Sequence, residues 1–134
     1  MLIANGAQGT IGKHLPKDTL SLGGDLATSE QLENFKSLKL EGSAFIHLAG
    51  VVGGPLVEKD VAYSERVNVE AVGEMGKTAL ACGLAKFVYV SSSHVYKSSS
   101  DSLTEESELG PISILPARIH RSNTESSSDS PVEN

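Results

Sequence analysis

The chain has 134 residues and a formal net charge of −6, from 11 Lys and Arg against 17 Asp and Glu; 39% of its residues are hydrophobic and one is a cysteine. This length allows one domain with a buried core and excludes two full domains. The acidic balance, with no cluster of Lys and Arg, argues against nucleic acid as a partner. The lone cysteine, Cys82, excludes an intrachain disulfide and a cysteine-based zinc site.

The sequence also argues against a membrane segment and a metal site. No apolar run is long enough to cross a bilayer, and the N-terminus lacks the basic flank of a signal peptide. We therefore expect a cytoplasmic protein with no membrane partner. His14, His47 and His120 have no metal-ligand spacing with one another or with a carboxylate cluster, so no bound metal is predicted.

Apolar runs and turn residues predict strands that alternate with helices along the first 90 residues. In chain order, the expected elements are a buried strand over 2–4, a short helix over 9–15 that stops before Pro16, a weak strand over 19–22, a helix from Thr28 or Ser29 to Leu38, a strand over 44–48, and a strand over 86–90. The strands over 44–48 and 86–90 are expected to be buried on both faces, as parallel strands are.

An amphipathic helix is expected before the last strand. Its apolar or small residues recur at steps of three and four: Val67, Ala71, Met75, Thr78, Ala79 and Cys82. Gly83 is expected to end it. Alternating strands and helices imply right-handed crossovers, so we predict an α/β fold with a parallel sheet and helices on both faces.

The composition changes near Tyr96, after which Ser, Glu and Pro dominate. The segment 126–130 reads Ser-Ser-Ser-Asp-Ser and cannot bury enough apolar surface to offset its ordering entropy. We therefore expect a folded domain over residues 1–112 and a disordered Ser-rich tail over residues 113–134.

The residues that carry chemistry begin directly after the first predicted strand. Residues 6–12 read Gly-Ala-Gln-Gly-Thr-Ile-Gly, a G-x-x-G-x-x-G turn that opens a helix. In such a turn Gly6 permits the tight bend, Gly9 lets a diphosphate approach the backbone, and Gly12 allows the helix to pack closely on the strand. Any one of these glycines is also compatible with an ordinary turn.

Five segments in order resemble the extended short-chain dehydrogenase/reductases, the family of NAD-dependent nucleotide-sugar epimerases and dehydratases. They are GAQGTIG at 6–12, GDL at 24–26, FIHLAG at 45–50, VNVEAVGEM at 67–75 and KFVYVSSSHVYK at 86–97, and the resemblance runs from Met1 to about Pro111. It implies a Rossmann-like domain that binds NAD or NADP, and a nucleotide-sugar substrate in intact relatives. Loss of the second lobe would expose apolar surface at the carboxyl edge of the sheet, so we also expect self-association as a homo-oligomer.

The resemblance also assigns site residues. Those expected to bind the cofactor are Gly6, Gln8, Gly9, Thr10, Ile11, Gly12, Asp25, Leu26, Leu48, Ala49, Gly50, Asn68, Val90 and Ser91. Among them, Asp25 and Leu26 would lie against the adenine. Ser92 would be the catalytic serine that hydrogen-bonds the reacting oxygen of the substrate, while His94 and Tyr96 are interpreted as packing residues.

The chain departs from the family pattern in three places. The family's catalytic Tyr-x-x-x-Lys pair is missing, because no tyrosine here is followed four residues later by a lysine. The sequence after Pro111 no longer resembles the family, so the substrate-binding lobe is expected to be absent and the chain to be inactive alone. Gly23 and Gly24 stand where an acidic residue would bind the adenosine ribose, which leaves the choice between NAD and NADP open.

Two other functions are compatible with the sequence. The missing tyrosine and lysine favour a non-catalytic dinucleotide-binding protein, or a remnant of a longer enzyme. Residues 71–78 also fit a permissive Walker A pattern, which would make the chain a nucleoside triphosphatase. The helical apolar stripe through the same residues argues against that alternative.

Overall fold

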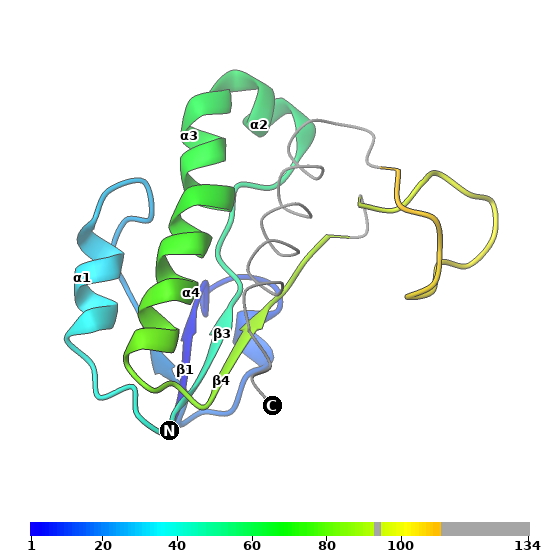
Figure 1. Cartoon of the computed structure of the whole chain (residues 1–134). Coiled ribbons are helices and arrows are strands. Elements are labelled where there is room, and N and C mark those ends of the chain that lie inside the picture. The colour runs from blue at the N-terminus through cyan, green and yellow to red at the C-terminus, as the bar shows by residue number, and fades with distance from the viewer. Residues whose placement is uncertain (93–94, 111–134) are drawn as a thin grey trace, which may run out of the picture. The chain divides into compact units, whose positions relative to one another are not determined.

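The computed structural model of the chain describes residues 1–92 and 95–110 (Figure 1). Two compact units divide between Val90 and Ser91, and each is described by itself. The expected domain end at residue 112 and the Ser-rich tail lie outside the described residues, as does His94. Within the described part, no helix is long and apolar enough to cross a membrane.

A four-stranded parallel sheet forms the centre of the first unit, as the sequence predicts. The strands are β1 (Leu2–Asn5), β2 (Leu20–Ser21), β3 (Ala44–His47) and β4 (Lys86–Tyr89), in the order β2-β1-β3-β4. The chain passes from β1 to one neighbour and then crosses to the opposite side of β1. The ends of β1, β2 and β3 therefore enclose a topological switch point, where ligands bind in open α/β sheets.

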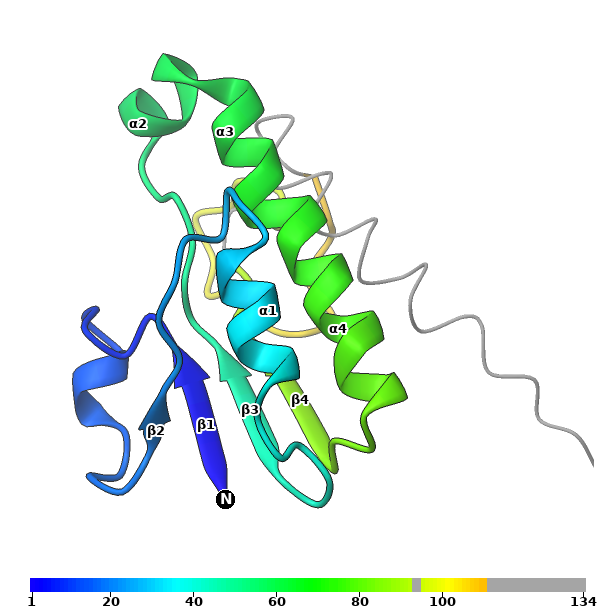
Figure 2. The same ribbon diagram turned by 90° about the vertical axis from the view of Figure 1, so that its left-hand side faces the viewer.

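The helices cover the two faces of this sheet unequally. The helical segments are the 3-10 turn η1 (Gly12–His14), α1 (Glu30–Lys36), α2 (Gly54–Lys59), α3 (Val61–Glu65), the π-helical segment η2 (Arg66–Glu70) and α4 (Ala71–Ala81). Helices α1 and α4 lie side by side across one face (Figure 2), and η1 lies on the other side of the sheet. The predicted helical structure on both faces is thus present, and among the described residues of this unit one face carries only the short turn η1.

The core lies between the sheet and the helix pair α1 and α4. The ring of Phe45 on β3 is 4.8 Å from that of Phe35 on α1 and 5.4 Å from that of Phe87 on β4, measured between centroids. Ile3 and Met75 are also fully buried. On the other face the side chains of β3 are only half-buried, so the expected burial of β3 and β4 on both faces is wrong. The reason is that α1 and α4 cover only the face to which Phe45 points.

The helix expected over residues 9–15 is shorter than predicted. Only Gly12–His14 is helical, as a 3-10 turn in which the Leu15 N–H donates to the Gly12 carbonyl at 3.1 Å. A segment opened by glycines and closed by Pro16 has only Ile11 and Leu15 as large apolar residues, and Ile11 is 55% exposed, so little packing stabilises a longer helix.

The helix expected from Val67 to Cys82 begins earlier, because α3, η2 and α4 follow one another without a break from Val61 (Figure 1). Its predicted end at Gly83 is confirmed. Gly83 has φ +70°, and the Leu84 N–H donates to the Ala79 carbonyl at 3.0 Å, which are the features of a Schellman motif. Cys82 lies at this end and is exposed.

The described residues of the second unit form a small hairpin. Tyr96 and Leu109 make an antiparallel bridge, and the Lys97 N–H donates to the Glu108 carbonyl at 2.8 Å. The Lys97 ammonium also lies 3.1 Å from the Glu108 carboxylate.

Candidate functional site

A cleft of about 390 Å³ opens at the carboxyl ends of β1, β2 and β3. Its walls come from residues 6–8, 21–26 and 49–51, together with Gln31, Tyr63 and Val67. The cleft brings together these predicted site residues: Gly6, Gln8, Asp25, Leu26, Ala49 and Gly50. The other predicted residues of the first unit lie outside its lining: Gly9, Thr10, Ile11, Gly12, Leu48, Asn68 and Val90.

The three glycines of the loop after β1 have different physical roles. Gly6 has φ +64°, and a Cβ there would lie 2.7 Å from the Ala49 backbone nitrogen. A Cβ on Gly12 would lie 2.4 Å from the Ala7 Cα. At Gly9 a Cβ would meet only the Gly6 carbonyl oxygen, at 3.2 Å, a tight contact that a shift of a few tenths of an ångström relieves. Gly6 and Gly12 are therefore required by the packing of the loop, whereas Gly9 is not.

Asn5, which the sequence reasoning missed, holds the loop after β3. Its side chain is fully buried, and its Oδ1 accepts from the Leu48 N–H at 2.9 Å and from the Ala49 N–H at 3.1 Å. Its Nδ2 donates to Gln31 Oε1 at 2.8 Å and lies 3.0 Å from His47 Nδ1. One amide thus satisfies four partners at the point where β1 ends.

Gln31 connects Asn5 to the turn after β2. Its Nε2 donates to the Gly24 carbonyl at 2.9 Å, and the neighbouring Asn34 Nδ2 donates to the Gly23 carbonyl at 3.1 Å. Gly24 has φ +108°, and a Cβ there would lie 2.9 Å from the Gln31 backbone. The turn is therefore attached closely to α1, and through Gln31 it is connected to Asn5.

His47 completes this buried network in its neutral form. The Asn5 amide donates toward His47 Nδ1, so the imidazole proton belongs on Nε2. Burial lowers the pKa of His47 from 6.5 to about 4. Among the described residues, Nε2 finds no hydrogen-bond partner, although the ring is only 1% exposed.

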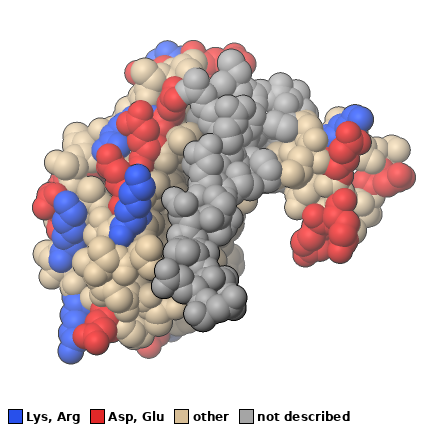
Figure 3. Space-filling model, in the orientation of Figure 1, with Lys and Arg blue, Asp and Glu red and all other residues tan. Residues whose placement is uncertain are grey.

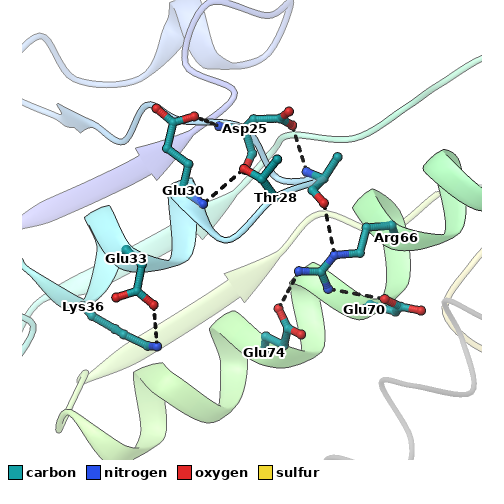
Figure 4. Close-up of polar contacts among 9 residues, drawn as sticks. Asp25, Thr28, Glu30, Glu33, Lys36, Arg66, Glu70 and Glu74 are labelled. Atoms are coloured by element: carbon teal, nitrogen blue, oxygen red, sulfur yellow. Dashed lines mark hydrogen bonds and ion pairs between the residues drawn. The ribbon is translucent and has the colours of Figure 1, made fainter.

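Asp25 presents the one charged side chain among the described residues that line the cleft. Its Oδ1 accepts from the Ala27 N–H at 2.8 Å, and its own N–H donates to Glu30 Oε2 at 3.0 Å (Figure 4). Thr28 Oγ1 donates to the Asp25 carbonyl at 3.2 Å. Of the two residues expected to start α1, Ser29 makes no side-chain capping bond, whereas Thr28 Oγ1 accepts from the Glu30 N–H at 3.2 Å. The bonds around Asp25 fix the direction of its carboxylate.

Asn68 and Arg66 attach the helical segment η2 to two of the cleft-lining loops. Asn68 Oδ1 accepts from the Val51 N–H at 2.8 Å, and its Nδ2 donates to the Val51 carbonyl at 2.9 Å. Arg66 Nε donates to the Ala27 carbonyl at 3.4 Å, while its guanidinium pairs with Glu70 and Glu74 (Figure 4). Such alternation of acidic and basic side chains recurs over the visible face of residues 1–90 (Figure 3).

The residues predicted around the catalytic serine lie at the boundary of the two units. The Val90 N–H donates to the His47 carbonyl at 3.2 Å, which extends the pairing of β4 with β3 by one residue. Ser91 and Ser92 belong to the second unit, where the Ser92 carbonyl accepts from the Val95 N–H at 3.2 Å.

The Walker A alternative at residues 71–78 is wrong. A phosphate-binding loop needs free backbone N–H groups that converge on one point, and it follows a strand directly. Residues 71–81 are α-helical and continue from η2, so their N–H groups donate within the helix. No cluster of three His, Cys, Asp or Glu side chains suited to a metal ion occurs in the described ranges.

A family model described as the NAD dependent epimerase/dehydratase family matches residues 2–118. The chain belongs to this family. The match includes the glycine loop, the turn after β2 and the loop after β3, which are the segments that line the cleft. No curated protein matches the chain.

Solved structures of similar fold include UDP-glucose 4-epimerase from Thermus thermophilus in complex with NAD, at 17% identity and a TM-score of 0.75, over 94% of this chain and 49% of that one. The dTDP-glucose 4,6-dehydratase DesIV from Streptomyces venezuelae, with NAD and TYD bound, matches at 21% identity and a TM-score of 0.73, over 92% of this chain and 49% of that one. RMD from Pseudomonas aeruginosa, complexed with NADPH, matches at 23% identity and a TM-score of 0.72, over 92% of this chain and 46% of that one. This chain spans about half the length of these proteins.

Proposed function

We propose that this chain is the dinucleotide-binding part of a nucleotide-sugar epimerase or dehydratase and that it holds NAD or NADP in the cleft at the ends of β1, β2 and β3. The observation that carries the proposal is the glycine loop at the topological switch point, where Gly6 brings the loop against Ala49 and Gly9 has no side chain to cover the backbone. Family membership adds an independent reason, because the family is NAD-dependent.

The residues present fit a dinucleotide. The loop of Gly6, Gln8, Gly9, Thr10, Ile11 and Gly12 would hold the diphosphate through backbone N–H groups. Since η1 has only three residues, its dipole adds little to this binding. Asp25 and Leu26 would hold the adenine, and Leu48, Ala49, Gly50, Asn68, Val90 and Ser91 would hold the rest of the cofactor. When bound, the nicotinamide supplies a site that accepts or donates hydride.

The proposed substrate of the whole enzyme is a nucleotide sugar, whose reacting oxygen Ser92 would polarise by a hydrogen bond. UDP-glucose 4-epimerase and dTDP-glucose 4,6-dehydratase among the similar structures are consistent with that substrate class. Because the 134 residues hold no Tyr-x-x-x-Lys pair, we propose that this chain binds the dinucleotide and does not turn over substrate by itself. A non-catalytic dinucleotide-binding protein is the second candidate, and the same observation supports it.

The remaining proposals concern the oligomeric state and the cellular compartment of the protein. Val52, Leu56 and Val61 are 77%, 62% and 52% exposed on and beside α2 and α3, and such apolar side chains favour self-association as a homo-oligomer. We place the protein in the cytoplasm, in line with its single cysteine.

Calorimetric titration of the full chain with NAD, NADP and ATP tests the proposed function. We expect NAD or NADP to bind and the Gly9→Val variant to lose that binding, because valine blocks the approach of the diphosphate to the backbone. A folded chain that binds neither dinucleotide would refute the proposal, and magnesium-dependent binding of ATP alone would point to a different site.

A further inference from the structure

The cleft has an apolar wall that the proposed diphosphate site leaves unused. Leu26, Val51, Tyr63 and Val67 line it. Leu26 is already assigned to the adenine, whereas Val51, Tyr63 and Val67 have no assigned role. Tyr63 is the one aromatic residue in the described lining of the cleft, and its side chain is 46% exposed. An exposed aromatic face in a ligand cleft is a surface on which a flat ring can stack.

The position of Tyr63 is fixed by its neighbours in the helix. Asp60 caps α3, since its Oδ1 accepts from the Tyr63 N–H at 2.9 Å. Val67 follows Tyr63 by one helical turn, so both side chains lie on the same face of the helix and both line the cleft. The bond from Arg66 Nε to the Ala27 carbonyl holds this part of the helix beside the turn that contains Asp25 and Leu26.

Asp25, which precedes Leu26 in the sequence, can recognise a base that carries an amine. Asp25 lines the same cleft with a carboxylate of which only Oδ1 has a described bond, to Ala27. A carboxylate oxygen accepts from an exocyclic amine and repels phosphate. An aromatic face and a carboxylate that line one cleft therefore match an aminopurine, and they do not match a diphosphate.

We propose that Tyr63 is a binding residue that stacks on the adenine of the dinucleotide, in the same cleft as Asp25 and Leu26, which the proposed function already assigns to this base. This inference rests on the proposed function and adds to it the residue that recognises the base. It also predicts that the cleft binds AMP and ADP-ribose, which carry the adenine, in preference to nicotinamide mononucleotide, which does not.

Replacement of Tyr63 by Leu and by Phe separates stacking from simple apolar contact. Base stacking on an aromatic side chain contributes about 1–3 kcal/mol, so Tyr63→Leu is expected to weaken AMP and NAD binding by roughly tenfold. Tyr63→Phe keeps the ring and is expected to bind within about twofold of the wild type. Leu80→Ala removes a side chain that is 85% exposed outside the cleft, and it serves as the control with unchanged binding.

A direct readout uses the absence of tryptophan from the chain. Tyr63→Trp introduces a single tryptophan, which can be excited beyond the absorption band of adenine. Stacking predicts that AMP and ADP-ribose quench its emission and that nicotinamide mononucleotide leaves it unchanged.

The outcomes separate this inference from the proposed function. If the wild type binds NAD but Tyr63→Leu binds it equally well, the role of Tyr63 is refuted and the cofactor site stands. Quenching by nicotinamide mononucleotide and not by AMP would refute the proposed orientation of the dinucleotide, in which the adenine lies against Tyr63. If the wild type binds no nucleotide, both proposals fail.

Discussion

Asn5 at the end of β1 and Gln31 on α1 are joined by a 2.8 Å hydrogen bond although they are 26 residues apart in the chain. Both side chains are buried, at 0% and 4% exposure. Asn5 also holds the loop after β3 through Leu48 and Ala49, and Gln31 also holds the turn after β2 through Gly24. The pair therefore fixes the three loops that form the cleft relative to one another before any ligand binds.

Substitution of Gln31 by Met tests this pair. Met fills a similar volume but removes the partner of both Asn5 Nδ2 and the Gly24 carbonyl, which leaves buried polar groups without hydrogen bonds. We expect the free energy of unfolding, measured by urea denaturation, to fall by about 2 kcal/mol. Glu33→Met on the exposed side of the same helix is the control, with a change within about 0.5 kcal/mol. Equal effects of the two substitutions would contradict the network.

The burial of His47 predicts a specific dependence of stability on pH. Its pKa is lowered to about 4 in the folded chain from 6.5, so the unfolded chain binds more protons between these values. The free energy of unfolding therefore falls as the pH falls through this window, by up to about 3 kcal/mol from this group. His47→Phe removes this contribution, whereas His14→Phe, which removes an exposed imidazole, does not. If the free energies of unfolding of the wild type and of His47→Phe change in parallel from pH 7 to about pH 4, the lowered pKa of His47 is refuted.

The sequence predicts the sheet better than it predicts the network in the cleft. Strands such as β3 and β4 are short apolar runs, and Gly83 is a local stop signal, so both can be located from neighbouring residues alone. Asn5 and Gln31 carry no such local signal, because their partners lie far along the chain and are known only once the strand order is known. The one available indication is that a polar residue at the end of a buried strand needs a partner.

The short η1 has a similar explanation. The glycine pattern predicts a loop correctly, but it cannot say how much helix follows, since helix length depends on the apolar face that the sheet offers. The unequal covering of the two sheet faces likewise depends on packing between distant segments.

The three loop glycines are expected to respond differently to alanine. At Gly6 and Gly12 a Cβ would overlap backbone atoms at 2.7 and 2.4 Å, so each substitution should cost at least about 2 kcal/mol of stability. Gly9→Ala should change stability by less than about 1 kcal/mol, because only the Gly6 carbonyl oxygen is near. Thermal unfolding measures the stability of the three alanine variants. Gly73→Ala, at an open helical position, is the control and should stabilise the chain by about 0.5–1 kcal/mol. A stable Gly6→Ala variant would contradict the described loop.

Asn68 is expected to be more sensitive than Asn34 to replacement by aspartate. Asn68→Asp keeps the acceptor for the Val51 N–H but places a carboxylate oxygen against the Val51 carbonyl, in a side chain that is 9% exposed. A loss of about 1–3 kcal/mol follows from the lost bond and the repulsion. Asn34→Asp makes the same change at the exposed contact with Gly23 and should cost less than about 0.5 kcal/mol. Urea denaturation above pH 6 compares the two variants. An equal loss of unfolding free energy would refute the role of Asn68 in holding the backbone of Val51.

The shift of backbone amide NMR signals when NAD is added to the 15N-labelled chain tests the dinucleotide site directly. We expect the signals of residues 6–12, 23–26 and 48–51 to shift together with one dissociation constant, while the signals of residues 71–78 stay in place. Shifts concentrated in residues 71–78, or no shift at saturating NAD and NADP in a folded chain, would contradict a dinucleotide site at the ends of β1, β2 and β3.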